Sequence, residues 1–411
     1  FNPDYYRLKY GVEPLEIKAL QNQIPNPSTR LVEYYLDSLN VYIFVIDQGK
    51  LSAWQLPHAE ELESLVRAVR SEHEAVLSGQ TGDPAFYAKQ LARLYEILIA
   101  PWAQNIEPEA SWVIVPHGVL HYLSFETLLP EAQTAWGSAP FLLQQVDIQY
   151  AWSADFWGRP PAPKQRSAEG FLGFAPTFGT AEDQVALRAK FAPLPNAVGE
   201  VQHAADLFAG QLFQGFLASE ANYYQYAKEA SIIHLATHSV ADDAFPMQSG
   251  FWLSMDNDTL EDGFLNALEI YNYPLQADLV VLSACNTGYG KLAQGEGVMS
   301  LGRAFSYAGS ESLLMSLWVA NDLATSTILN GFYEGLAAGN PKQMALQKAK
   351  RDYLEKADPL TAHPAYWSHL IFLGNPQPLS APWGMMNWLM IGGLGLLIGS
   401  VLLFWFRGAK T

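Results

Sequence analysis

Short apolar runs alternate with longer stretches in which apolar residues recur at helical spacing, and this alternation continues along most of the chain. Runs that predict buried strands lie at 31–47, 51–56, 112–116, 171–174, 231–238, 279–285 and 313–318. Segments that predict helices, because their apolar residues recur at helical spacing, lie at 58–77, 84–101, 196–208, 219–228, 297–307, 323–336 and 341–356. Strands that alternate with helices predict an α/β fold, with parallel strands and helices on both faces of the sheet.

Proline and glycine mark the boundaries between the predicted units. Residues 1–30 are polar and turn-rich, and the chain begins with Phe1, so we expect this stretch to be a linker or the end of an upstream unit. A proline-rich stretch between 158 and 170 interrupts regular structure. It divides the chain into a first half, 31–160, and a second half, 168–376.

The C-terminal part has a different pattern. Residues 359–406 include no Asp, Glu, Lys or Arg, and 388–406 are almost wholly apolar. As a helix, this apolar stretch is about 28 Å long, close to the thickness of the hydrocarbon core of a bilayer. We expect one transmembrane helix over 385–406, which would contact the lipid bilayer, and a basic tail over 407–411. The basic tail favours a cytoplasmic C-terminus, whereas tail anchoring places the main domain inside the cell, so the topology stays open.

Composition excludes some classes of partner and of site. The chain has 411 residues, a formal net charge of −17 and one cysteine. An acidic chain without clustered Lys and Arg is unsuited to binding nucleic acid. One cysteine excludes an intramolecular disulfide and a cysteine-rich zinc site.

Neither a cofactor nor a metal ion is expected. The glycine-rich stretch 288–297 fits neither the dinucleotide-binding nor the P-loop pattern, and a loop beside a reactive residue explains it better. His117 and His121 have the four-residue spacing of some metal ligands, but no third ligand accompanies them. His363 and His369 are expected to be structural.

The candidate chemistry lies at the ends of two apolar runs. Cys285 ends the run 279–285 ahead of a polar, glycine-closed turn, and His238 ends the run 231–238. If the two strands are parallel neighbours, both side chains emerge at the same edge of the sheet, where an imidazole can activate a thiol. A lone cysteine in an apolar run is more often an inert core residue, but the position at the strand end favours a nucleophile. His234 shares a face with His238 and is expected to be a packed core histidine.

Six motifs in the second half together resemble the CHAT domain, a caspase-like cysteine peptidase family that is related to separase and often follows tetratricopeptide repeats. Two segments of the first half, WVIVPHGVLHYLSFETL (112–128) and VYIFVID (41–47), extend the resemblance. The six motifs are HLATH (234–238), VLSACNTG (281–288), GEGVMSLGRAF (295–305), SLWVANDLAT (316–325), HPAYW (363–367) and FLGNP (372–376). His238 precedes Cys285 by roughly 50 residues, which is the caspase spacing.

The resemblance implies a caspase-like three-layer α/β/α sandwich in two halves, the first catalytically silent and the second active. It implies a cysteine endopeptidase with Cys285 as nucleophile and His238 as its partner, which the apolar C-terminal stretch would anchor in the membrane. The backbone N–H groups of Cys285 and Ser239 would stabilise the oxyanion. Ser239 stands where the family usually has glycine.

Asp322 has two interpretations. It can be the N-cap of the helix that follows. Alternatively, the resemblance to separase implies an acidic residue in the S1 pocket, which would favour a basic side chain at the P1 position of a protein substrate. Metacaspases have an acid two positions before the cysteine, where this chain has the neutral Ser283.

Two other functions stay open. The chain can be a non-catalytic, membrane-tethered scaffold that binds protein partners, among them an upstream tetratricopeptide region or a regulatory protein. It can also be an acyltransferase or another thiol enzyme that acts on a small substrate. An intact His238 and Cys285 favour the peptidase over the scaffold.

Overall fold

The chain divides into two units, Phe1–Pro378 and Leu379–Thr411. A computed structural model describes residues 15–158, 170–176, 194–240, 242, 245–254, 262–283, 297–319 and 321–379, with backbone alone for 297–300. The expected transmembrane segment and basic tail lie outside the described residues. None of the helices in the described ranges is long and apolar enough to span a bilayer.

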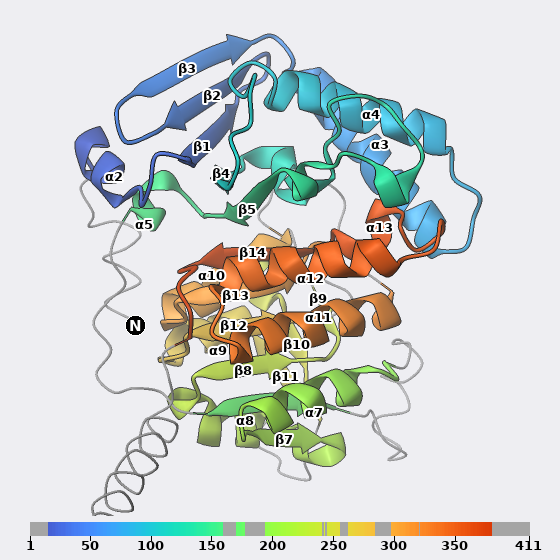
Figure 1. Ribbon diagram of the computed structural model, residues 1–411. Helices are drawn as coiled ribbons and strands as arrows, with labels where there is room; N and C mark the ends of the chain where they lie inside the picture. Colours follow the sequence, from blue (N-terminus) through green and yellow to red (C-terminus); the bar gives the residue numbers. More distant parts are fainter. Residues whose placement is uncertain are drawn as a thin grey trace, which may run out of the picture. The chain divides into compact units, whose positions relative to one another are not determined.

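One eleven-stranded sheet forms the centre of the first unit (Figure 1), in the order β3-β2-β1-β4-β5-β14-β13-β12-β8-β6-β7. Its strands are β1 Thr29–Leu36, β2 Val41–Ile46, β3 Leu51–Leu56, β4 Ala110–Val115, β5 Val146–Tyr150, β6 Phe171–Ala175, β7 Gln211–Gln214, β8 Ile232–Leu235, β12 Leu279–Leu282, β13 Ser312–Ser316 and β14 Leu370–Gly374. A small antiparallel sheet has β9 Ser239–Val240, β10 Gly250–Trp252 and β11 Phe264–Asn266.

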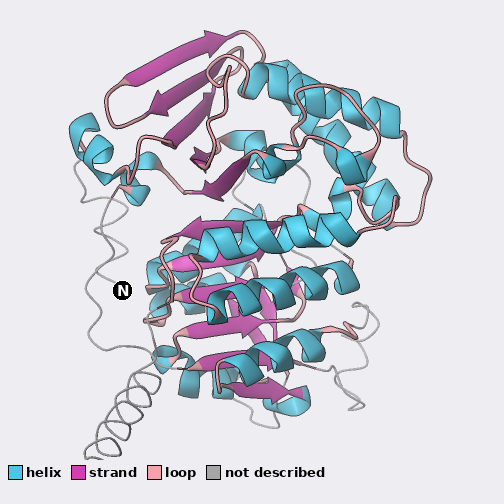
Figure 2. Ribbon diagram, in the orientation of Figure 1, coloured by secondary structure: helices cyan, strands magenta, loops and turns pink. Residues whose placement is uncertain are grey.

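Helices connect these strands, as Figure 2 shows in cyan. The α-helices are α2 Ile17–Gln23, α3 Ala59–Leu77, α4 Pro84–Leu98, α5 Ala154–Trp157, α7 Ala197–Leu207, α8 Glu220–Tyr226, α9 Ala267–Asn272, α10 Gly297–Ala308, α11 Asp322–Ala337, α12 Lys342–Lys356 and α13 Pro364–Trp367. Short 3₁₀ turns are η1 Gly118–Tyr122, η2 Phe125–Thr127, η3 Trp136–Ser138, η4 Leu142–Gln144, η5 Gly215–Leu217, η6 Ala227–Glu229 and η7 Pro246–Gln248.

Strand directions divide the large sheet into two parts. β1, β4 and β5 are parallel, and the hairpin β2–β3 adds two antiparallel strands. β13, β12, β8, β6 and β7 are all parallel. Between the parts lies β14, antiparallel to β13 and joined to β5 by the parallel pair Leu373↔Tyr150. The predicted mixed α/β fold with a large central sheet is confirmed.

The central parallel strands β6, β8, β12 and β13 are buried on both faces, which explains their mostly apolar sequences. Every residue of β8 and of β12 is buried. A strand covered by helices on both sides needs apolar side chains at successive positions rather than at alternate ones. The runs at 231–238 and 279–285 therefore indicated central strands correctly.

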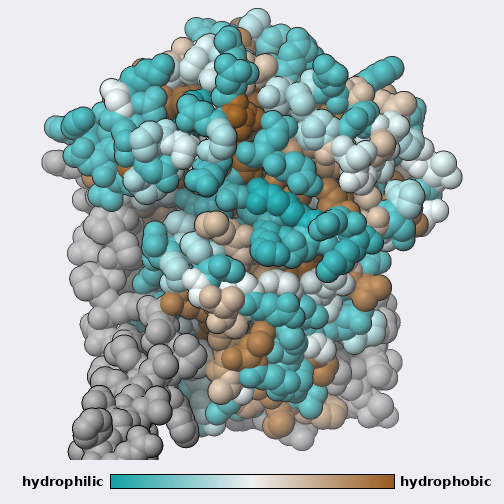
Figure 3. Space-filling model, in the orientation of Figure 1, coloured by the Kyte–Doolittle hydropathy of each residue, from teal (hydrophilic) through white to brown (hydrophobic). Residues whose placement is uncertain are grey.

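Helices α7, α11 and α12 cover one face of the second part of the sheet (Figure 1). α11 and α12 approach closely because small residues meet there: a Cβ added at Gly335 would lie 2.9 Å from the Cβ of Ala345. The outer surface of α12 is mostly hydrophilic (Figure 3). This layer supplies several polar side chains to the sheet ends.

Part of the stretch that was expected to be a linker is regular structure. Residues 17–23 form α2, and the side chains of Leu20 and Ile24 are buried with Leu31 and Ile46. The backbone N–H of Leu15 donates to Asp155 Oδ1 at 2.8 Å. Residues 15–24 are thus packed on the first half of the sheet.

Candidate active site at the carboxyl ends of β8 and β12

β8 and β12 are parallel neighbours, which is the condition on which the interpretation of His238 and Cys285 depends. Their register pairs Val281 with His234 and Leu282 with Leu235. His238 lies three residues beyond Leu235 and is buried, with 5% of its surface exposed. β12 ends at Leu282 and the described residues continue only to Ser283, so Cys285 lies outside the described residues.

Ser239 begins β9 directly after His238. The N–H of Trp252 donates to the carbonyl of His238 at 2.9 Å, and Ser239 faces Phe251 across the strand pair. This hydrogen bond makes Ser239 and Phe251 a non-hydrogen-bonded pair of the antiparallel ladder. The N–H of Ser239 therefore does not point toward β10.

His234 belongs to a buried polar network, which agrees with its interpretation as a core histidine. Its Nε2 is 2.9 Å from Ser283 Oγ, and its Nδ1 is 3.0 Å from the hydroxyl of Tyr333 on α11. The Ser283 hydroxyl donates to Glu200 Oε1 at 2.7 Å. Burial, with the nearby Glu200 charge as a second cause, raises the pKa of Tyr333 well above its usual value.

Glu200 is the member of this network that sequence patterns did not indicate. It lies in the first turn of α7 with 2% of its surface exposed. Its Oε2 has no hydrogen-bond partner among the residues that the structure describes. A glutamate in an amphipathic helix is normally expected on the solvent side. The only sequence signal of its burial was that Glu200 lies on the apolar face of the predicted helix.

Asp322 is not the N-cap of α11, which corrects one of its two interpretations. The N-cap is Asn321, whose side chain accepts from the N–H of Ala324 at 3.1 Å. Asp322 is the first residue of the helix, and its Oδ2 accepts from the backbone N–H and the side-chain amide of Asn196 at 2.8 and 2.7 Å. One helical turn at the start of α7 therefore contacts both Asp322, through Asn196, and Ser283, through Glu200.

The histidines of the first half make local contacts. His117 Nδ1 accepts from the N–H of Leu36 at 3.1 Å, and burial lowers its pKa. His121 Nδ1 is 3.0 Å from the carbonyl of Gly118 in the same turn. Within the described ranges, no group of three potential metal ligands is present.

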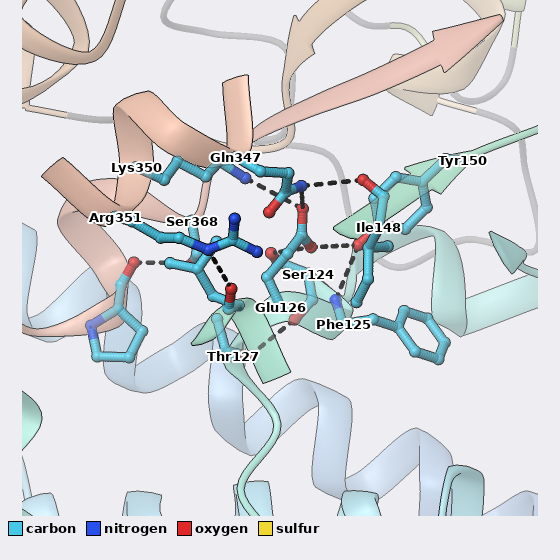
Figure 4. Close-up of polar contacts among 12 residues, drawn as sticks. Ser124, Phe125, Glu126, Thr127, Ile148, Tyr150, Gln347, Lys350, Arg351 and Ser368 are labelled. Carbon is cyan, nitrogen blue, oxygen red and sulfur yellow. Dashed lines mark hydrogen bonds and ion pairs between the residues drawn. The ribbon is translucent and has the colours of Figure 1, made fainter. Parts of the chain in front are cut away.

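A buried ion pair joins the two halves beneath α12 (Figure 4). Lys350 Nζ lies 3.1 Å from Glu126 Oε1, and neither side chain is exposed. Glu126 Oε2 accepts from the hydroxyls of Tyr150 and Ser124 at 2.5 and 2.9 Å. Gln347 donates to the carbonyl of Ile148 at 2.9 Å. The second half thus contacts the first through charge as well as through β14.

His363 and His369 are buried, in line with the expected structural role. The His363 ring stacks on Tyr87 at 4.8 Å between centroids. Burial lowers the pKa of His363 to about 4 and that of His369 to about 3. His369 Nε2 is 3.1 Å from the hydroxyl of Thr325.

Comparison with known proteins places the chain in a family. The CHAT domain matches residues 88–375, more than half of the chain. The chain belongs to the CHAT domain family. The resemblance to the CHAT domain that the sequence motifs suggested is therefore confirmed.

Relatives of the CHAT chain are much longer proteins. Tetratricopeptide repeat protein 28 of Homo sapiens is 22% identical over 344 residues, which are 72% of this chain and 14% of that protein. Its Mus musculus counterpart is 22% identical over 338 residues, covering 71% and 13% respectively. The chain therefore spans about one seventh of the length of these relatives.

A solved structure has the same fold. The separase–securin complex of Saccharomyces cerevisiae matches the CHAT chain with a TM-score of 0.50 and 9% sequence identity, covering 87% of this chain and 30% of that chain. At this identity the likeness concerns the fold alone. It supports a mixed α/β architecture around a large central sheet, as in separase.

Proposed function

We propose that this CHAT chain is a cysteine endopeptidase, with Cys285 as nucleophile and His238 as its acid and base. The observation that supports this best is the parallel pairing of β8 and β12, with Leu235 opposite Leu282. His238 and Cys285 each follow that pair by three residues. Equal offsets from paired residues on neighbouring strands favour two side chains at the same sheet edge.

The proposed reaction is acyl transfer through a thioester. The Cys285 thiolate attacks the carbonyl carbon of the scissile peptide bond while His238 holds the thiol proton. The tetrahedral intermediate breaks its C–N bond, and His238 gives the proton to the departing amine. A water molecule then attacks the thioester, with His238 as base, and the carboxylate product leaves as the thiol re-forms.

The backbone N–H groups of Ser239 and Cys285 are the proposed donors to the oxyanion. The position of Ser239 in a non-hydrogen-bonded pair supports this role, because its N–H is not used in the pairing with β10. Donors of this kind typically stabilise the transition state by about 3 kcal/mol. Ser239 stands where the family usually has glycine, but its backbone N–H can still donate to the oxyanion.

We further propose that Asp322 accepts a basic P1 side chain. The two donors that Asn196 directs at Asp322 Oδ2 resemble the donors that a guanidinium offers to a carboxylate. A P1 arginine would compete with Asn196 or use Oδ1. In this proposal the half over 168–376 is the active one, and the half over 31–160 is a silent copy.

The membrane anchor remains a proposal based on the sequence. The apolar stretch 388–406 has the length and composition of a spanning helix. Alkaline carbonate extraction of membranes that contain the full chain should leave the protein in the pellet. Release into the supernatant would rule out a spanning helix. If the protein stays in the pellet, protease protection in sealed vesicles reports the side of the domain.

The peptidase is tested by labelling the full chain with arginyl and leucyl acyloxymethylketone probes and mapping the adduct by mass spectrometry. We expect modification of Cys285 that is lost in His238→Ala and kept in His117→Ala, a matched control from the silent half. Arginine selectivity that disappears in Asp322→Asn would support the S1 role. Labelling without side-chain preference would support the peptidase proposal but contradict the proposed role of Asp322 in binding the P1 side chain.

Absence of labelling, also in the presence of candidate upstream partners, would contradict the peptidase and favour the scaffold. The names of the long relatives suggest that tetratricopeptide repeats are such partners. A small-molecule thiol enzyme would instead be indicated by alkylation of Cys285 with iodoacetamide that is slowed in His238→Ala, without labelling by peptidyl probes.

A further inference from the structure

Four polar side chains form one continuous buried chain beside the candidate site. They come from four elements: Tyr333 from α11, His234 from β8, Ser283 from the end of β12 and Glu200 from α7. None is more than 5% exposed. A buried polar network that joins so many elements fixes their relative positions when every link is made.

The direction of each hydrogen bond follows from the carboxylate at one end. Glu200 can only accept when ionised, so the Ser283 hydroxyl donates to it, and the lone pairs of Ser283 accept from His234 Nε2. With one proton on the imidazole, that proton is then on Nε2, and Nδ1 accepts from Tyr333. The raised pKa of Tyr333 keeps that hydroxyl protonated and able to donate. Glu200 thereby sets the orientation of the whole network.

The network lies at the point where the backbone pairing of β8 with β12 ends. Leu235 and Leu282 are the last paired residues of β8 and β12. The His234–Ser283 hydrogen bond joins side chains of these two strands at that end. It therefore restrains the distance between the segments that lead to the candidate dyad.

Stability alone does not explain Glu200. A buried carboxylate oxygen without a partner among the described residues costs free energy, of the order of 1–3 kcal/mol or more. Apolar side chains of similar size often replace buried polar groups without loss of stability. Departures from the rules of stable packing are commonly found at functional sites.

We propose that Glu200 is a positioning residue, which acts through Ser283 and His234 to hold the ends of β12 and β8 in the register that the dyad requires. The inference rests on the proposed peptidase function and adds a residue to it. Glu200 and Ser283 do not touch the substrate in this proposal. Their loss should therefore lower kcat and leave KM nearly unchanged.

The test uses Glu200→Leu, Glu200→Gln, Ser283→Ala and the double variant Glu200→Leu/Ser283→Ala in the full chain. With a peptidyl-arginyl fluorogenic amide, we expect Glu200→Leu and Ser283→Ala each to lower kcat about 10- to 100-fold, the range that misplacement of reacting groups by about 1 Å can produce. The double variant should lose less than the sum of the single losses, because both substitutions remove the Ser283–Glu200 hydrogen bond, while Glu200→Leu also removes the 3.4 Å contact of Glu200 Oε1 with His234 Nε2. Glu200→Gln should retain most activity, since its amide oxygen still accepts from Ser283.

Two further readouts separate positioning from a general loss of structure and from failure of the proposed function. The melting temperature should be unchanged or higher in Glu200→Leu. The rate of Cys285 alkylation by iodoacetamide, followed over pH, should fall in Ser283→Ala relative to the unsubstituted chain, and this measurement needs no peptidase activity.

The outcomes are distinct. If the unsubstituted chain cleaves nothing while Ser283→Ala still slows alkylation, the peptidase proposal fails and the positioning role stands. Cleavage that is unaffected by all four variants, additive losses in the double variant, or losses that follow the melting temperature would overturn the positioning role alone.

Discussion

The buried pair of Glu126 and Lys350 allows a quantitative prediction. Both side chains are 0% exposed and lie 3.1 Å apart. Lys350→Met keeps a similar shape but leaves the Glu126 carboxylate buried without a counter-charge. Removing one partner of a buried pair typically costs about 3–5 kcal/mol. The hydrogen bonds to Glu126 from Tyr150 and Ser124 remain, so we expect the lower part of this range, about 3 kcal/mol.

The double variant Glu126→Gln/Lys350→Met removes both charges. The glutamine side chain can still accept from Tyr150 and Ser124. We therefore expect the double variant to be more stable than Lys350→Met alone, because desolvation of an unpaired carboxylate no longer applies. Burial already lowers the pKa of Lys350, although Glu126 opposes this. Replacing the Lys350 ammonium with an apolar group removes the free-energy cost of desolvating the ammonium.

The assay is urea unfolding of the full chain at neutral pH, followed by tryptophan fluorescence. Lys348→Met is a matched control on the same helix, since its side chain is 65% exposed and pairs only with Asp352 on the surface among the contacts described. It should leave the free energy of unfolding unchanged within the scatter of surface substitutions. A loss below about 1 kcal/mol in Lys350→Met, or equal losses in the single and double variants, would refute the reasoning.

Three other predictions follow from single contacts. The folded-state pKa of His363, about 4, lies below its ordinary 6.5, so its contribution to stability is complete above pH 6.5 and is lost as the pH falls toward 4. His363→Gln should therefore reduce acid destabilisation over this range by up to about 3 kcal/mol in urea titrations at several pH values, and an unchanged pH profile would contradict this. Gly309 has φ +115°, and a Cβ there would lie 2.4 Å from the carbonyl oxygen of Leu275; Gly309→Ala should cost about 1–3 kcal/mol in the same unfolding assay, and a neutral result would mean that the turn is free to shift. Asn196→Ala removes one donor from Asp322 and should raise kcat/KM for arginyl substrates but not for leucyl ones, whereas an equal effect on both would remove Asp322 from P1 recognition.

The sequence predicted the strands well because a buried parallel strand leaves a strong local signal. The apolar runs that end at His238 and Cys285 indicated strands, whereas the adjacency of the two strands was only a condition of the interpretation, which the structure meets. The family motifs lie in the same segments. The register of Leu235 with Leu282, however, needs the three-dimensional structure.

Long-range polar contacts could not be predicted. Glu126 and Lys350 are separated by more than half of the chain, and neither lies in a motif that announces a buried charge. Asn321 and Asp322 are both residue types that cap helices, so the sequence alone could not choose between them. Asn196, which engages Asp322, is also distant in sequence. Such contacts depend on how α7, α11 and α12 pack, and the pattern of apolar residues along the chain does not specify this packing.

The position of β14 has a consequence for the biosynthesis of the protein. This strand is the last of the sheet in chain order, yet it lies in the middle, between β13 and β5. Until residues 370–374 leave the ribosome, the sheet exists as two parts with open inner edges, and open edges can pair with other chains. Insertion of β14 closes both edges at once. A chain that terminates before residue 370 should therefore aggregate or be degraded, and the sheet can be completed only after β14 has been synthesised.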